Sequence, residues 1–186
     1  MAERDPVVIA GGGPVAMVLG LALYRAGVPF VVLESLPEPF VDQRAASYHP
    51  PTIEMLEGLG LTDEIIPEGL KSPVYRFHDR VTRDVVAEFD LADLKDELKF
   101  PFVLQYEQYK LVRKILQLHG DWPEFDVRLS HTVTGVTQFD DHVDVEVELA
   151  DGTRDVVRGA YAIGCDGGRS TVRKAAGIEF VGFTYP

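Results

Sequence analysis

Residues 7–34 contain the feature that most constrains the fold, a strand–turn–helix–strand pattern whose turn is three consecutive glycines. Residues 7–10 are wholly apolar and largely β-branched, which is typical of a buried parallel strand. Apolar residues then recur with helical spacing from Pro14, a natural first helical position, until Gly27 ends the helix. Residues 30–33 form a second apolar run. The pattern predicts a β-α-β unit with a right-handed crossover.

The turn between the first strand and the helix has the spacing of a dinucleotide-binding loop, Gly11-x-Gly13-x-x-Ala16. Gly11 permits a tight turn, Gly13 lets a diphosphate approach the backbone without meeting a Cβ, and Ala16 keeps the helix close to the strand. The helix begins at Pro14-Val15, where free amides and the positive end of the helix dipole would bind the diphosphate. A glycine-rich turn without a ligand is the alternative.

Glu34 closes the second strand, 23 residues (34 − 11) after Gly11, which is close to the spacing of about 20 expected for a ribose-binding carboxylate. Ser35 follows it directly. The Glu34 carboxylate would accept hydrogen bonds from ribose hydroxyls and would repel a phosphate on that ribose. We therefore expect an unphosphorylated adenine ribose, as in FAD or NAD rather than NADP.

The sequence outside residues 7–34 predicts further strands and helices around this unit. Turns are expected at residues 140–142 and at Asp151-Gly152, the second of which is a strong hairpin signal. The expected fold class is α/β, a Rossmann-like parallel sheet with an inserted antiparallel β-meander. The individual expectations are a loop over 35–50, helices over 52–59, 107–119 and 170–176, a hairpin over 74–90, the meander over 127–159 and a buried strand over 161–164.

A second strand–turn–helix element follows the meander, with Gly164-Cys165-Asp166-Gly167 at its turn. It resembles the Asp-Gly motif of the aromatic hydroxylase family of flavoprotein monooxygenases, which contains p-hydroxybenzoate hydroxylase and phenol hydroxylase. The first glycine turn and Glu34 alone leave FAD and NAD open, and the second turn favours FAD. The resemblance covers nearly all of residues 6–183.

The resemblance implies further contacts with FAD. Arg44-Ala45 looks like the family's loop near the flavin and pyrophosphate, and Gln105 matches a residue that contacts the FAD linker. Val133 sits where the family lines the adenine pocket, and Asp166 would orient Arg44 or backbone amides near the pyrophosphate. The alternatives are a solvated arginine at 44, a plain helix-start residue at 105 and a turn aspartate at 166.

The resemblance also implies that the chain is incomplete. The family has a later Gly-Asp motif that binds the FAD ribityl chain, and a substrate-binding sheet that covers the flavin. Neither occurs in this sequence. We therefore interpret residues 1–186 as the amino-terminal FAD-binding domain of a longer enzyme. A short protein that binds a nucleotide or a partner without catalysis is the alternative of a different class.

In that family NAD(P)H reduces FAD, and a flavin hydroperoxide then delivers oxygen to an electron-rich aromatic ring. The resemblance thus implies a FAD-dependent monooxygenase whose partners are NAD(P)H, molecular oxygen and a small phenolic or polyketide-like substrate. A related flavoprotein reductase or epoxidase is the alternative within the same fold. Because the cofactor supplies the chemistry, we assign no catalytic residue.

Composition argues against several other classes of protein. A net charge of −12 would be repelled by nucleic acid and by an anionic membrane face. The five histidines lack metal-ligand spacing, so no metal site is expected. The single cysteine and the lack of any long apolar run favour a soluble, cytoplasmic protein. Substrate identity and oligomeric state do not follow from the sequence.

Overall fold

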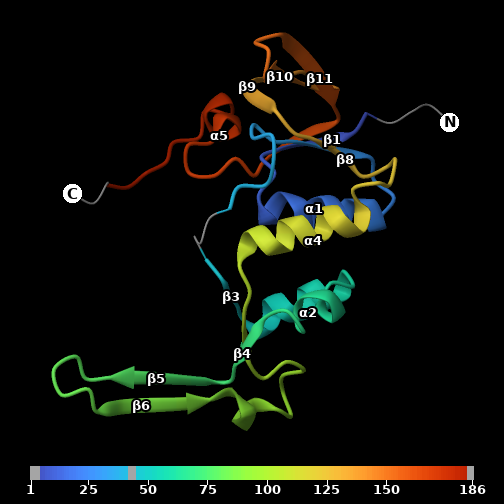
Figure 1. The fold of residues 1–186 in the computed structure, drawn as a ribbon. Coiled ribbons are helices and arrows are strands. Elements are labelled where there is room, and N and C mark those ends of the chain that lie inside the picture. The colour runs from blue at the N-terminus through green and yellow to red at the C-terminus, as the bar shows by residue number, and fades with distance from the viewer. Residues whose placement is uncertain (1–4, 42–44, 184–186) are drawn as a thin grey trace. The chain divides into compact units, whose positions relative to one another are not determined.

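The structure of the chain is a computed structural model, and it describes residues 5–41 and 45–183. The chain divides into two compact units. The first combines Met1–Val41 with Ile115–Pro186, and the second is Asp42–Lys114. Figure 1 shows the elements of both units.

The first unit is built on a parallel sheet with the strand order β12-β1-β2-β8. The predicted β-α-β unit is confirmed, because β1 and β2 pair in parallel and helix α1 connects them. The sheet elements are β1 (Val7–Ala10), α1 (Pro14–Arg25), β2 (Phe30–Leu33), β8 (Asp126–Arg128) and β12 (Tyr161–Gly164).

The two central strands are buried over their whole length because both faces of the sheet are covered. On one face, Val8 and Val31 belong to an apolar cluster with meander residues such as Val145. On the other face lies α1, where a Cβ on Gly20 would stand only 2.8 Å from the Phe30 ring. Figure 1 shows α1 and the meander on opposite sides of the sheet.

The antiparallel meander is formed by β9 (His131–Gln138), β10 (Val143–Leu149) and β11 (Arg154–Gly159). Its predicted turns are confirmed, and Gly152 has the positive φ of +81° that a tight turn requires. Its predicted start at 127 is wrong, because β8 pairs in parallel with β2. The chain leaves the sheet after β8 at Ser130, where φ is +58° and the amide donates to the Leu36 carbonyl at 3.0 Å.

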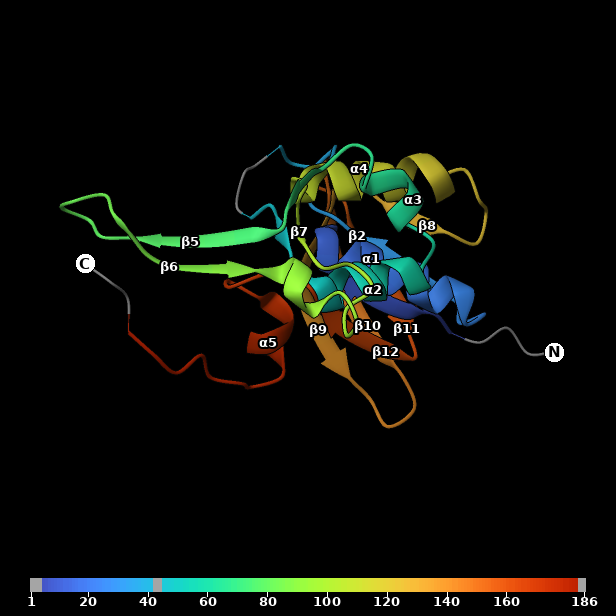
Figure 2. The ribbon, with the colours of Figure 1, turned by 90° about the horizontal axis from the view of Figure 1, so that it is seen from below.

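Strand β12 was expected to be buried, and the structure places it at an edge of the sheet instead. Its neighbour within the described residues is β1 alone, and the Tyr161 side chain is 69% exposed. Helix α5 (Thr171–Ala175) follows and lies beside β9 (Figure 2). Ser170 is the N-cap of α5, because its Oγ accepts a hydrogen bond from the Arg173 amide at 3.0 Å.

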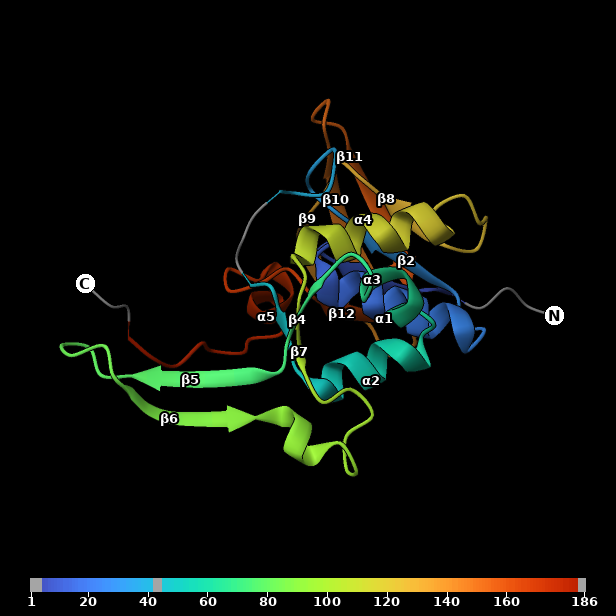
Figure 3. The same ribbon diagram turned by 60° about the horizontal axis from the view of Figure 1, so that its bottom comes forward.

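The second unit contains short helices, a small antiparallel sheet in the order β3-β7-β4, and the predicted hairpin β5-β6 (Figure 3). Helix α2 starts at Pro50, two residues earlier than expected, because proline is tolerated where helix amides lack partners. Strand β3 occupies part of the expected 35–50 loop. The bounds are β3 (Ser47–Tyr48), α2 (Pro50–Gly58), α3 (Thr62–Ile65), β4 (Leu70–Ser72), β5 (Val74–His78), β6 (Val85–Asp90), the 3₁₀ helix η1 (Leu91–Leu94) and β7 (Val103–Gln105).

Helix α4 (Gln108–His119) begins in the second unit and ends in the first, close to its predicted bounds. Among the residues that the structure describes, no helix has both the length and the apolar character to cross a membrane.

His119 ends α4 within an aromatic group of the first unit, with ring centroids 4.4 Å from Trp122 and 5.8 Å from Phe125. Its Nδ1 is buried and has no hydrogen-bond partner among the described residues. Burial, reinforced by the positive charge of Arg25, lowers the pKa of His119 below its ordinary value of 6.5. The fold therefore favours the neutral form of this imidazole.

Replacing His119 with Phe should make folding stability less sensitive to acid. Just below pH 6.5 the unfolded wild-type chain binds a proton at His119 that the folded chain does not, so stability rises with pH through this window and falls on acidification. Urea unfolding at pH 7.5 and 5.5 measures the effect. If the free energy of unfolding falls by the same amount between pH 7.5 and pH 5.5 in the wild type and in His119→Phe, the account is contradicted.

Candidate dinucleotide-binding site

The glycine turn Gly11-Gly12-Gly13 connects the carboxyl end of β1 to the start of α1. Its first amide stays attached to the sheet, because Gly11 N donates to the Leu33 carbonyl of β2 at 2.8 Å. Gly11 has a φ of +94°, which favours glycine. Ligands of open parallel sheets bind outside the carboxyl ends of the strands, and the turn lies at that edge.

The two turns predicted from the sequence are in direct contact. An ideal Cβ on Gly11 would stand 2.6 Å from the carbonyl oxygen of Cys165, so glycine permits this backbone approach as well as the tight turn. The Cys165 amide donates to the Ala10 carbonyl at 2.8 Å. Burial, together with the charge of Asp166, raises the pKa of the half-buried Cys165 thiol, which disfavours the nucleophilic thiolate.

The middle glycine packs against the predicted ribose-binding carboxylate. Gly12 N donates to Glu34 Oε2 at 2.5 Å, and a Cβ on Gly12 would stand 2.8 Å from the Glu34 Cβ. Sequence reasoning explained Gly11 and Gly13 but missed Gly12. The sequence did contain an indication, because the loop pattern requires glycine at positions 11 and 13 but not at position 12, where a third glycine stands.

Backbone and side-chain donors hold the Glu34 carboxylate in place. Its Oε1 accepts from the Leu36 amide at 2.9 Å and from Ser35 Oγ at 3.0 Å. Each carboxylate oxygen can accept about two hydrogen bonds. Among the described residues Oε2 has one donor, the Gly12 amide, so this oxygen can accept a further hydrogen bond from a ribose hydroxyl.

The amino terminus of α1 is open to an anion. Gly13 is the N-cap residue in an extended conformation, and no side chain caps the helix within the described residues. The first turn begins at Pro14, carries no acidic residue and includes Val15, which is 69% exposed. A Cβ on Gly13 would meet no described atom within 4 Å. The helix thus presents amides and its positive dipole end to open space, which fits a bound diphosphate.

Asp166 stabilises the start of α5. Its Oδ2 accepts from the Thr171 amide at 2.6 Å and from the Val172 amide at 3.3 Å. Its Oδ1 is buried and has no hydrogen-bond partner among the described residues. Gly167, the next residue, has a φ of +75°. The second turn therefore combines a fixed aspartate with one unused buried acceptor.

Val133 lies on β9, whose start is tied to the Glu34 segment. The His131 amide donates to the Glu34 carbonyl at 2.8 Å, so β9 begins beside the end of β2. The Val133 side chain is partly buried and packs against the core cluster. The structure thus brings Val133, Glu34 and the glycine turn into one unit.

The remaining predicted residues belong to the second unit or lie outside the described residues. Gln105 ends β7, and its Oε1 accepts from Ser47 Oγ at 2.8 Å, a partner that the sequence did not indicate. Ala45 is exposed and precedes β3. Arg44 lies outside the described residues.

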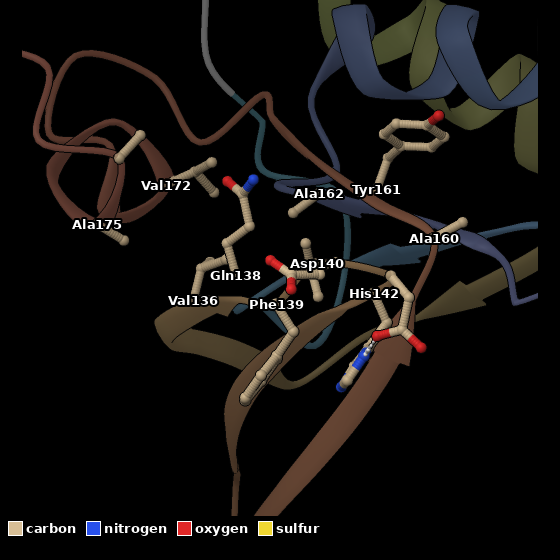
Figure 4. A pocket seen from close by; sticks show the side chains of 13 residues that line it. Val136, Gln138, Phe139, Asp140, His142, Ala160, Tyr161, Ala162, Val172 and Ala175 are labelled. Atoms are coloured by element: carbon tan, nitrogen blue, oxygen red, sulfur yellow. Dashed lines mark hydrogen bonds and ion pairs between the residues drawn. The ribbon is translucent and has the colours of Figure 1, made fainter.

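A separate cavity of about 400 Å³ lies in the first unit between β9, β10, β12 and α5. Figure 4 shows the Gln138 side chain between Val172 of α5 and Ala162 of β12. None of the predicted FAD-contacting residues that the structure describes lines this cavity. It is therefore distinct from the site at the glycine turn.

A family model described as "FAD binding domain" matches residues 4–186. Para-nitrophenol 4-monooxygenase from Pseudomonas sp. (strain WBC-3) is 32% identical over 185 residues, which cover 100% of this chain and 45% of the relative. The 12-dehydrotetracycline 5-monooxygenase/anhydrotetracycline 6-monooxygenase from Streptomyces rimosus is 35% identical over 183 residues, which cover 96% of this chain and 34% of the relative.

A solved monooxygenase structure has the same fold as this chain over the matched part. The crystal structure of p-nitrophenol 4-monooxygenase from Pseudomonas putida DLL-E4 matches with a TM-score of 0.92 and 32% identity, over 100% of this chain and 46% of that one. The chain spans less than half the length of these relatives. The predicted resemblance to the FAD-binding portion of aromatic-ring monooxygenases is thus confirmed, and the chain belongs to the FAD-binding domain family.

Proposed function

We propose that residues 1–186 are the FAD-binding part of a monooxygenase that uses NAD(P)H and molecular oxygen to hydroxylate a small aromatic substrate. One observation carries the proposal. The uncapped start of α1 at Gly13 lies beside Glu34, whose carboxylate is held by backbone amides. An anion site and a ribose acceptor on adjacent turns suit the adenosine diphosphate half of FAD.

Different residues of the first unit would bind different parts of FAD. The free amides of the first helical turn, from Val15 onward because Pro14 has no N–H, would hold the diphosphate, with Pro14 starting the helix and Gly11 keeping the turn tight. Glu34 and Ser35 would hold the adenine ribose. The negative charge of Glu34 disfavours a phosphate on that ribose, which supports FAD and argues against NADP at this position.

The other assigned residues would complete the site around the adenine and the linker. Val133 is proposed to line the adenine pocket, which its position on β9 beside Glu34 supports. Asp166 and Gly167 would lie near the pyrophosphate, where the unused Oδ1 of Asp166 could accept a hydrogen bond. Gln105 is proposed to contact the FAD linker. The loop at Arg44-Ala45 is proposed to lie near the flavin and the pyrophosphate.

Bound FAD would supply the redox chemistry and the activation of oxygen, and the chain would supply binding, orientation and charge. A permanent cation such as Arg44 suits contact with diphosphate. The names of the relatives support a phenolic or polyketide-like substrate. We place the residues that bind it outside residues 1–186. Consumption of NAD(P)H and the single cysteine support a reducing cytoplasm as the compartment.

Replacing Gly13 with Val in the full-length protein should abolish FAD retention with little loss of stability. The valine side chain would occupy the open space above the helix amides, and its Cβ would clash with no described atom. We expect FAD affinity to fall at least about 100-fold, which corresponds to about 2.7 kcal/mol. Flavin absorbance after desalting measures retention.

Gly58→Val is the matched control, because its Cβ would also meet no described atom within 4 Å and the residue lies at the end of α2. This control should stay yellow. A flavin-loaded Gly13→Val protein would refute the assignment of the diphosphate to this turn.

The full-length protein supplied with NAD(P)H, a phenol such as p-nitrophenol and isotopically labelled oxygen (¹⁸O₂) should insert one labelled oxygen atom into the aromatic product. The physical reason is that a monooxygenase takes the inserted atom from molecular oxygen rather than from water. Mass spectrometry of the product measures the label. An oxygenated product without the ¹⁸O label would contradict a monooxygenase. NAD(P)H oxidation that no phenol stimulates and that gives no oxygenated product would argue for a reductase instead.

A further inference from the structure

Gln105 lies on β7, the central strand of the small antiparallel sheet of the second unit. It pairs directly with Ser47 of β3 on one side and with Leu70 of β4 on the other. Directly paired residues point to the same face of a sheet. The next pair along, Tyr48 with Leu104, is buried, whereas Ser47 is exposed. The Gln105 side chain therefore shares with Ser47 the face that is turned away from the interior of the unit.

A hydrogen bond determines which end of the Gln105 carboxamide faces Ser47. The Ser47 hydroxyl donates to Gln105 Oε1 at 2.8 Å. A carboxamide has one accepting oxygen and one NH₂ group with two donors. With the oxygen bonded to Ser47, Gln105 Nε2 donates to none of the residues that the structure describes. This arrangement leaves two N–H donors available to a ligand.

The backbone beside this hydrogen bond is also held in place. The Tyr106 amide donates to the Ala46 carbonyl at 2.7 Å, next to the Ser47–Gln105 pair. Leu104 is fully buried and anchors β7 through its other face. Strands that are fixed in this way keep the Ser47 hydroxyl within reach of the carboxamide.

A glutamine side chain without such a partner is a poorly defined donor. Its terminal torsion is broad, and the oxygen and the NH₂ group can exchange places. Ordering the side chain on binding costs conformational entropy, and a hydrogen bond made in advance removes part of that cost. The oxygens of a diphosphate accept hydrogen bonds and have none to donate. A carboxamide that contacts them must therefore present its N–H donors.

We propose that Ser47 is a positioning residue for FAD, because it holds the Gln105 carboxamide with its NH₂ group directed toward acceptor oxygens of the FAD linker. Ser47 then acts through Gln105 and needs no contact with the cofactor. The inference rests on the proposed function, which takes Gln105 as a contact of the linker. It adds the direction of that hydrogen bond, with Gln105 as the donor, and the residue that sets the direction.

Calorimetric titration of the full-length apoprotein with FAD tests the role of Ser47. We expect Ser47→Ala to weaken binding about tenfold, which corresponds to about 1.4 kcal/mol, and Ser47→Thr, which keeps the hydroxyl, to bind as the wild type does. Ser72→Ala is the matched control, because it makes the same chemical change on β4 of the same sheet, and it should leave the affinity unchanged. Ser47→Val suits a strand and lacks the hydroxyl, so it replaces Ser47→Ala if that variant does not fold.

Changes at Gln105 separate positioning from a direct contact of Ser47 with FAD. In a Gln105→Ala background, Ser47→Ala should cause no further loss of affinity, because the side chain that Ser47 holds is gone. Gln105→Glu keeps an acceptor for the Ser47 hydroxyl and loses both N–H donors. We expect this variant to bind FAD at least about tenfold more weakly than the wild type.

Three results would each overturn the inference. They are wild-type affinity in Ser47→Ala, a tenfold effect of Ser47→Ala that persists in the Gln105→Ala background, and wild-type affinity in Gln105→Glu. The proposed function would survive all three if the wild type binds FAD and Gly13→Val does not. A wild type that does not bind FAD would overturn the proposed function and the inference together.

Discussion

The approach of two backbone turns at one edge of the parallel sheet is the constraint on which the site depends. Gly11 lies so close to the Cys165 carbonyl that a Cβ would stand 2.6 Å from its oxygen. This contact joins turns that are far apart in the sequence, and parallel pairing of β1 with β12 places both at the carboxyl ends of their strands. The first turn then leads into the uncapped start of α1, and the second carries Asp166, which accepts hydrogen bonds from the amides at the start of α5. A bulkier residue at position 11 would separate the turns before any ligand arrived.

Glu34 has a structural role as well as the proposed ligand role. Amides of Gly12 and Leu36 hold its two oxygens, so the carboxylate is fixed in the absence of a ribose. A group held in advance loses little conformational freedom on binding, which is the general advantage of preorganisation. Backbone amides are neutral donors, so they stabilise the charged carboxylate and leave its net charge in place. A paired lysine or arginine would instead cancel that charge. The charge therefore remains available to exclude a phosphorylated ribose.

Local signals in the sequence predicted most of the fold, and long-range pairing caused the errors. Apolar periodicity and glycine positions are encoded within short windows, so the β-α-β unit and the hairpins were correct. Strand β8 was assigned to the meander because three residues cannot reveal whether they pair in parallel with β2. The bond from Ser47 to Gln105 was missed for the same reason, since it joins residues far apart in the sequence. Arg44 stays a prediction.

A crystal structure of the full-length protein with FAD tests the central claim most directly. The account predicts the diphosphate against the amides that follow Gly13, with an adenine-ribose hydroxyl donating to Glu34 Oε2. It also predicts that the contact between Gly11 and the Cys165 carbonyl is kept. A diphosphate bound elsewhere, or a Glu34 carboxylate turned away from the ribose, would contradict the account.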